Sequence, residues 1–321
     1  MESLLSKFRA IGDMRWKETH FWDDFSNRGH TLRDYTMNFF PKRLKEDRRV
    51  VFGDFTPRTV WHSDEFDLER ELLLPKRVHS VLPNAKLIVL VRNPVDRLLS
   101  DFSYYFRSVI PVSIRSRYFH NRVVEAIEWW NNCTSMYSVR HCVYGHHFDL
   151  TKMTPLDVVN CDNLIHVPHR LTSHIPRTHL PYLDPHLDGN SSIVHRRRRK
   201  GGVNCDYDFN WRSNAGDRLR IGLYHVHIRE WLKHFPRDQL LVLKFEENIV
   251  DTDAYVTQVL DFLKVKDRSL LPGKSLHNTD KHSTELKTLM WDKTRKVLED
   301  FYRPHNQELA QLLQDDKFLW Q

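Results

Sequence analysis

Short apolar runs alternate along this chain with longer segments in which apolar residues recur every three or four positions. The runs at 50–55, 87–91 and 239–245 have the length of buried strands. Helical spacing is found at 32–40, 69–82, 94–106, 118–132, 219–235, 253–263 and 293–313. Short apolar strands that alternate with helices predict an α/β fold, with a central parallel sheet flanked by helices on both faces.

The segment 86–106, KLIVLVRNPVDRLLSDFSYYF, joins the most strand-like run to an amphipathic helix. The run ends at Arg92, Asn93 is a good helix N-cap, and Pro94 suits the first helical position. Asn93 and Ser100 are seven residues apart, so both fall on the side opposite the apolar face. A strand that ends in arginine at a helix N-terminus predicts an anion-binding site. The alternative is an ordinary strand–helix unit whose arginine is only solvated.

Length and composition are compatible with one large core. The chain has 321 residues, 40% of them hydrophobic, and we predict a single domain over 1–321. Residues 149–216 are rich in Pro, His, Asn, Asp and Gly, and we interpret them as an irregular insertion that contains cysteines. The longest wholly apolar run has about five residues, far below the roughly 20 that span a bilayer. Residues 1–12 lack a signal-peptide pattern, so neither a signal nor a membrane anchor is expected within this chain.

Charge favours an acidic partner. Lysine and arginine outnumber acidic residues by 49 to 42, a formal net charge of +7. A basic surface suits nucleic acid, anionic lipid or acidic polysaccharide, and no nucleic-acid-binding signature supports the first. The basic run at 196–200 is either a solvated loop or a contact for sulfated or carboxylated polysaccharide. In the second case Arg197 and Arg198 would bind such groups bidentately.

Cysteines and sequons indicate the compartment. All four cysteines fall in the middle of the chain, and none forms a C-x-x-C pair, so a zinc site is not expected. Their number and grouping fit one or two disulfides with the pairing open; they are Cys133, Cys142, Cys161 and Cys205. Glycosylation sequons begin at Asn132 and Asn190. Together these features favour the lumen of the secretory pathway.

The segment 86–106 resembles the 3′-phosphate-binding motif of the sulfotransferases, which use 3′-phosphoadenosine 5′-phosphosulfate (PAPS) as sulfuryl donor. That motif is a strand, then Arg-Asn-Pro, then a serine on the following helix. The resemblance implies that Arg92 and Ser100 bind the 3′-phosphate of the donor. Residues 222–243 and 301–320 also parallel a helix–strand unit and a C-terminal helix of the same enzymes, in the same order.

The segment 15–22 reads as a strand on which Glu18, His20 and Trp22 share one face. It resembles the Lys-Glu-x-x-Phe-Phe element of the glycosaminoglycan sulfotransferases, in which the glutamate is the general base. The resemblance implies that Glu18 is the base and that His20 assists it. Lys17 and Trp22 are then candidate acceptor ligands, with the aromatic ring as a wall beside the sugar. The alternative is a partly exposed edge strand.

The family also holds the 5′-phosphosulfate in a strand followed by a Lys-x-Gly-Thr loop. That loop precedes the first helix, so we expect it to lie before Met1, and this chain to lack the first strand and the phosphosulfate loop. A late family loop corresponds in position to 273–285, where Lys274 and Lys281 are candidate donor ligands. The predicted fold is therefore a P-loop-NTPase-like sheet without its first strand.

The resemblance implies an enzyme that transfers a sulfuryl group from PAPS to a hydroxyl of a glycosaminoglycan in the Golgi lumen. PAPS is a cosubstrate, and no metal is expected. The nearest branch is that of the chondroitin and dermatan N-acetylgalactosamine 4-sulfate 6-O-sulfotransferases, followed by the heparan sulfate 3-O-sulfotransferases. Attachment to a membrane is expected only through an anchor outside this chain. The alternative is an inactive relative that binds acidic polysaccharide.

Overall fold

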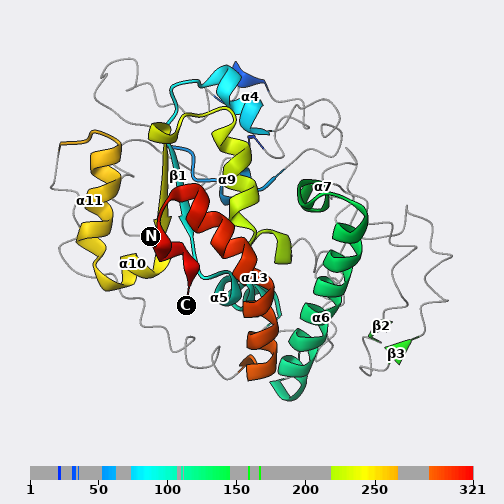
Figure 1. Ribbon diagram of the computed structural model, residues 1–321. Coiled ribbons are helices and arrows are strands. Elements are labelled where there is room, and N and C mark those ends of the chain that lie inside the picture. Colours follow the sequence, from blue (N-terminus) through cyan, green and yellow to red (C-terminus); the bar gives the residue numbers. More distant parts are fainter. Residues whose placement is uncertain are drawn as a thin grey trace. The chain divides into compact units, whose positions relative to one another are not determined.

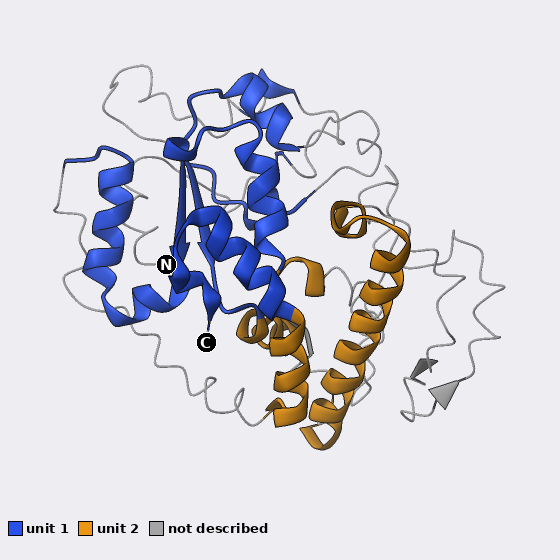
Figure 2. Ribbon diagram, viewed as in Figure 1, with its two compact units in different colours: residues 1–94, 223–281, 302–321 blue, residues 95–222, 282–301 orange. Residues whose placement is uncertain are grey.

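The computed structural model describes residues 21–22, 31–33, 35, 53–62, 74–106, 110, 112–144, 158–159, 166–167, 218–266 and 289–320. The chain divides into two compact units, each assembled from segments far apart in the sequence (Figure 2). Unit 1 comprises residues 1–94, 223–281 and 302–321, and unit 2 comprises residues 95–222 and 282–301. Each unit is described by itself below, and the single domain over 1–321 stays a prediction.

Unit 1 contains a parallel strand pair, β1 (Leu87–Val91) and β4 (Leu240–Lys244). Leu87 lies opposite Leu240, and the register continues to Val91 opposite Lys244. Because side chains alternate along a strand, Val89 and Val91 are buried, while Ile88 and Leu90, the residues that precede them, are 39% and 37% exposed. The predicted parallel pairing of apolar strands is confirmed, and one face of β1 carries the core.

Helices of unit 1 cover that face of the sheet. They are α9 (Tyr224–Leu232) and the C-terminal part of α13 (Asp292–Leu313), followed by the 3₁₀ helix η7 (Asp316–Leu319) (Figure 1). The cluster they form with the strands consists of Val89, Val91, Tyr224, Ile228, Leu240, Val242, Leu309, Ala310, Leu313 and Phe318. This packing holds the two strands and their carboxyl ends in place.

The remaining helices of unit 1 are α4 (Leu74–Val81), α10 (Phe245–Val250) and α11 (Thr252–Phe262), with two 3₁₀ turns, η3 (Pro57–Val60) and η6 (Arg237–Gln239). α4 packs against α9. A second apolar cluster consists of Phe21, Trp22, Tyr35, Leu74, Val78, Trp231 and Phe235. The predicted strand at 50–55 is not found at 53–55, where the Asp54 carboxylate accepts hydrogen bonds from Tyr35 and Thr56.

Unit 2 is built on helices: α5 (Pro94–Phe106), α6 (Val112–Met136), α7 (Val139–Tyr144) and the first turns of α13. The apolar face of α5 is buried at Leu98, Leu99 and Phe102, and the Phe102 ring lies 4.8 Å from that of Phe119 on α6. α6 begins at Val112 rather than at 118. A short antiparallel pair, β2 (Val158–Val159) and β3 (His166–Val167), falls in the segment predicted as irregular.

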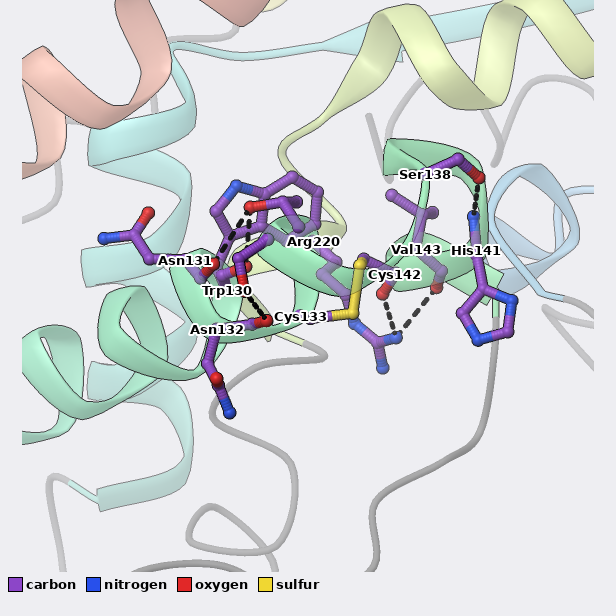
Figure 3. Close-up of a disulfide and its surroundings, with 11 residues drawn as sticks. Trp130, Asn131, Asn132, Cys133, Ser138, His141, Cys142, Val143 and Arg220 are labelled. Carbon is purple, nitrogen blue, oxygen red and sulfur yellow. Dashed lines mark hydrogen bonds between the residues drawn. A yellow bond between two sulfur atoms is a disulfide. The ribbon is translucent and has the colours of Figure 1, made fainter.

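A disulfide between Cys133 and Cys142 joins α6 to α7 (Figure 3). It is one of the pairings that the sequence left open, whereas Cys161 and Cys205 lie outside the described residues. Arg220 is buried beside it, and one of its nitrogens donates to the carbonyl oxygens of Cys142 and Val143 at 2.8 and 2.9 Å. No helix in the described part of the chain is long and apolar enough to cross a bilayer.

Candidate active site

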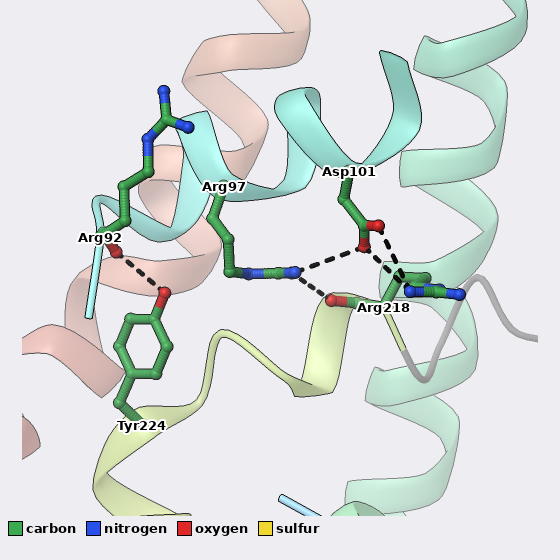
Figure 4. A network of polar contacts seen from close by, with 5 residues as sticks. All are labelled: Arg92, Arg97, Asp101, Arg218 and Tyr224. Carbon is green, nitrogen blue, oxygen red and sulfur yellow. Dashed lines mark hydrogen bonds and ion pairs between the residues drawn. The ribbon is translucent and has the colours of Figure 1, made fainter. Parts of the chain in front are cut away.

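Arg92 stands directly after β1, at the carboxyl end of the parallel pair. Its carbonyl oxygen accepts a hydrogen bond of 2.9 Å from the Tyr224 hydroxyl, while its side chain extends away from that contact (Figure 4). The guanidinium carbon lies 5.5 Å from the ring centroid of Phe245, the first residue after β4. The guanidinium has no hydrogen bond or ion pair with any other residue that the structure describes. The backbone is thus fixed while the donors of the planar group stay available to an anion.

The turn between β1 and α5 is held by a carboxylate from the other strand. The Asn93 N–H donates to Glu246 Oε1 at 2.7 Å, and Trp320 Nε1 donates to Glu246 Oε2 at 3.4 Å. Glu246 follows β4 and therefore lies at the same edge of the sheet as Asn93. Lys244, at the end of β4, donates to the carbonyl of Lys317 at 2.8 Å, 5.5 Å above the Trp320 ring. Ligands of parallel α/β sheets bind outside this carboxyl edge.

In unit 2, Ser100 lies on α5 and is partly buried. Its hydroxyl has no hydrogen bond to another described residue. The adjacent Asp101 carboxylate pairs with Arg97 at 3.4 Å and with Arg218 at 3.3 Å, and Arg97 also donates to the Arg218 carbonyl (Figure 4). This network ties residue 218 to the middle of α5. It fixes the helix turn that carries Ser100.

Among the residues that the structure describes, no group of three or more His, Cys, Asp or Glu side chains could hold a metal ion. The polar groups described above are mostly donors, and the carboxylates among them already accept hydrogen bonds or form ion pairs. Such an arrangement favours binding of a phosphate-like anion through charge-assisted hydrogen bonds.

Comparison with known proteins agrees with this chemistry. The family described as "Sulfotransferase domain" matches residues 191–298. Human carbohydrate sulfotransferase 15 is 25% identical over 95% of this chain and 45% of its own length. Mouse heparan sulfate glucosamine 3-O-sulfotransferase 3B1 is 24% identical over 74% of the chain and 65% of its own length. The chain is thus similar to the sulfotransferases.

The fold agrees with that family. A crystal structure of a sulfotransferase from Alicyclobacillus acidocaldarius superposes with a TM-score of 0.52 at 16% identity, covering 98% of this chain and 92% of the other. At this identity the match shows the fold alone, and it supports the predicted α/β class. The chain spans about half the length of the carbohydrate sulfotransferase 15 proteins, 45% in the human one.

Most of the predicted site residues lie outside the described part of the chain. Arg92 and Ser100 are placed as given above, one in each unit. Those that stay predictions are Lys17, Glu18, His20, Arg197, Arg198, Lys274 and Lys281.

Trp22 differs from its prediction. Residues 21 and 22 form a turn instead of the end of a strand, and Trp22 is 6% exposed within the second apolar cluster. The centroid of its ring lies 4.9 Å from that of Phe21 and 5.8 Å from that of Tyr35. Phe21 and Trp22 would point to opposite faces of a strand, but here both are buried in the same cluster. A ring packed in this way stabilises the core, and its contact with an acceptor sugar stays a prediction.

The sequence did not single out the supporting residues Phe245 and Glu246, and it treated Tyr224 only as scaffold. Each contacts the β1–α5 turn from a position more than a hundred residues away, 132 for Tyr224 and 153 for Glu246. One signal in the sequence could have located Phe245 and Glu246. The run at 239–245 is a second apolar strand, and its carboxyl end must lie beside that of β1 if the two strands are parallel neighbours.

Two buried histidines lie in unit 1. His225 Nε2 on α9 lies 3.0 Å from His305 Nδ1 on α13, with the rings stacked at a centroid distance of 5.2 Å. The pKa of His225 is lowered to about 3, chiefly by burial and also by the charges of His305, Arg229 and His227. Burial likewise lowers the pKa of His305 to about 4, against an opposing effect of Glu308. Both rings are therefore neutral in the folded chain near neutral pH.

This pair predicts a loss of stability in mild acid. The unfolded chain takes up protons below the ordinary histidine pKa of about 6.5, whereas the folded pair does not, so stability falls as the pH drops below that value. At pH 5 we expect a cost of about 2 kcal/mol for each imidazole. Urea unfolding at pH 7 and pH 5 measures it, and His225→Asn should remove about half of the difference. The control is His62→Asn, and equal pH dependence in all three proteins would contradict the prediction.

Proposed function

We propose that this chain transfers a sulfuryl group from PAPS to a hydroxyl of a glycosaminoglycan. The observation that carries the proposal is Arg92, whose backbone is fixed at the carboxyl edge of the sheet while its guanidinium pairs with no described residue. An arginine so placed favours a dianionic phosphate, which it can bind bidentately. The names of the relatives, carbohydrate and heparan sulfate glucosamine 3-O-sulfotransferases, support a glycan acceptor.

In this proposal the donor is held through its 3′-phosphate. Arg92 supplies two parallel N–H donors, and the Ser100 hydroxyl adds a third hydrogen bond. Lys274 and Lys281 then neutralise the phosphosulfate end. The support is that neither the Arg92 guanidinium nor the Ser100 hydroxyl has a hydrogen-bond partner among the described residues, and that Glu246 holds the Asn93 N–H directly after Arg92.

The proposed transfer is a direct in-line displacement. The acceptor oxygen forms a bond to sulfur while the bond from sulfur to the bridging phosphate oxygen breaks, and adenosine 3′,5′-bisphosphate leaves with that electron pair. Glu18 accepts the proton of the attacking hydroxyl, with His20 beside it. Lys17 and the pair Arg197 and Arg198 bind the acidic groups of the acceptor. The proposed setting is the Golgi lumen.

Transfer of labelled sulfate from PAPS tests the proposal. With the full chain as enzyme, we expect label in chondroitin sulfate or heparan sulfate and none in neutral dextran, because only the first two carry acidic groups for the basic surface. Acceptor chains digested to disaccharides would identify the sulfated position. Binding of adenosine 3′,5′-bisphosphate without any transfer would contradict the proposed activity while leaving the donor site intact.

A second candidate function is that of an inactive relative that binds acidic polysaccharide. The formal net charge of +7 and the arginine run at 196–200 favour it. It predicts salt-sensitive retention on heparin with no affinity for adenosine 3′,5′-bisphosphate. If the Arg197→Ala/Arg198→Ala double variant eluted from heparin at the same salt concentration as the wild type, these two arginines would be excluded as the contact.

A further inference from the structure

We infer that Asn132 carries an N-linked glycan, and that this glycan is attached before the Cys133–Cys142 disulfide closes. The inference is independent of the sulfotransferase activity. It rests on the Cys133–Cys142 disulfide, on the exposed Asn132 and on the helix that carries both Asn132 and Cys133. The amide nitrogen of Asn132 would form a bond to the anomeric carbon of an oligosaccharide carried on a polyprenyl diphosphate. The bond from that carbon to phosphate oxygen breaks, the lipid diphosphate leaves with the electron pair, and the amide nitrogen loses one proton.

The disulfide places the chain in the compartment where such transfer occurs. Cys133 and Cys142 are bonded, and structural disulfides form in oxidising compartments such as the lumen of the endoplasmic reticulum. Cys133 is the middle residue of the sequon Asn132-Cys133-Thr134. The sequon therefore contains both a cysteine whose disulfide forms in the lumen and an asparagine that can accept a glycan there.

The folded chain has room for a glycan at this position. Asn132 lies in the last turn of α6 and is exposed, as is the neighbouring Asn131. Its side chain points away from the disulfide (Figure 3). Trp130, two residues earlier, is 5% exposed and contacts Phe301 at a ring distance of 5.9 Å. A bulky, hydrophilic group on Asn132 is thus directed to solvent without displacing the core of unit 2.

The folded helix nevertheless conceals the acceptor sequon. The Thr134 hydroxyl donates to the carbonyl oxygens of Trp130 at 3.0 Å and Asn131 at 3.3 Å. Residues two apart on a helix do not face each other, so Asn132 and Thr134 cannot be presented together to a transferase while α6 is intact. The asparagine must accept the glycan while this turn is still unwound.

The disulfide decides how long that turn can unwind. Its closure links the last turn of α6 to α7, whose carbonyl groups Cys142 and Val143 are held by the buried Arg220. Once the bond has formed, the end of α6 is tied at Cys133, between the two residues of the sequon. Glycan attachment and disulfide closure therefore compete, and a chain that closes first stays unmodified at Asn132.

Mass spectrometry of the secreted chain tests both parts. The full chain is produced in a eukaryotic cell behind a cleavable leader, with Asn190→Gln as background, and only leader-processed protein is analysed. Peptide N-glycosidase F in ¹⁸O-water should convert Asn132 to labelled Asp, and the accompanying mobility shift should be lost in Asn132→Gln and Thr134→Ala. Cys142→Ala leaves the whole sequon in place. It should raise glycan occupancy at Asn132 about twofold, because disulfide closure, which takes seconds to hours, no longer competes with glycan attachment.

Each result decides one part, whether or not a variant folds, because occupancy is read on peptides. Absence of label at Asn132 in both the wild type and Cys142→Ala would overturn the glycosylation site. Equal occupancy in those two proteins would overturn the competition with the disulfide. A matched control is Ser138→Ala, which lies between the two cysteines, removes the hydroxyl that accepts from the His141 N–H at 3.2 Å, and changes neither the sequon nor the disulfide.

Discussion

Replacing Arg92 by alanine is expected to weaken the binding of adenosine 3′,5′-bisphosphate by about 10- to 100-fold. A bidentate pair between arginine and phosphate consists of charge-assisted hydrogen bonds, each worth about 1.5–3 kcal/mol. The structure leaves this guanidinium without a hydrogen bond or ion pair to a described residue, places it beside the Phe245 ring and fixes its backbone through Tyr224, so little of the binding energy goes into ordering the arginine. Isothermal titration calorimetry with the full chain measures the affinity directly.

Two further variants separate this explanation from a general effect of charge. Arg92→Lys keeps the charge but loses the planar fork, and should fall between the wild type and Arg92→Ala. Arg229→Ala is the matched control, because this arginine is about half exposed in an ion pair of 2.9 Å with Glu308, and should bind the nucleotide like the wild type. If Arg92→Ala and Arg229→Ala bound equally well, Arg92 would be no phosphate ligand.

The strand and helix around Arg92 could be predicted because the determinants are local. A continuous apolar run predicts β1, and an N-cap, a proline and helical spacing predict α5. The same reasoning predicted β4 and α13 to within a residue or so of their ends, since β4 is a continuous apolar run and α13 keeps helical spacing over its whole length. The carboxyl edge of the sheet follows from parallel pairing alone.

What surrounds Arg92 could not be predicted from pattern. Tyr224 and Glu246 reach the turn after β1 across the fold, and neither their identity nor their spacing in the sequence announces that contact. Trp22 shows the opposite failure, since a local rule predicted a strand where the structure has a turn. Alternation assigned it to a different face from Phe21, whereas packing with Tyr35 and Trp231 buries both rings. Tertiary packing decided against a weak strand preference.

The disulfide illustrates a third limit. Four cysteines allow several pairings, and nothing in their spacing selects one. The structure selects Cys133 and Cys142 because α6 and α7 bring them to a Cα separation of 5.9 Å, within the range that a disulfide requires. The close approach depends on the turn between the helices.

Glu18→Gln is expected to reduce the sulfuryl-transfer rate by about 100-fold or more while nucleotide binding is retained. Glutamine has nearly the shape of glutamate but cannot accept the proton of the acceptor hydroxyl. The attacking oxygen would then have to develop positive charge as it bonds to sulfur. Because the donor is held elsewhere, through Arg92 and Ser100, its affinity should not change. Initial rates of label transfer and calorimetric titration of the same preparation measure the two quantities.

The pairing of these two measurements makes the assignment specific. A protein that has merely lost its fold loses nucleotide affinity together with turnover, whereas loss of a base lowers turnover alone. Glu128→Gln, an exposed glutamate on α6, makes the same chemical change away from the site and should leave both quantities unchanged. Equal turnover in Glu18→Gln and the wild type would remove Glu18 from the mechanism. His20→Asn could then be compared in the same assay, since His20 is the other side chain in this segment that could take the proton from the sugar hydroxyl.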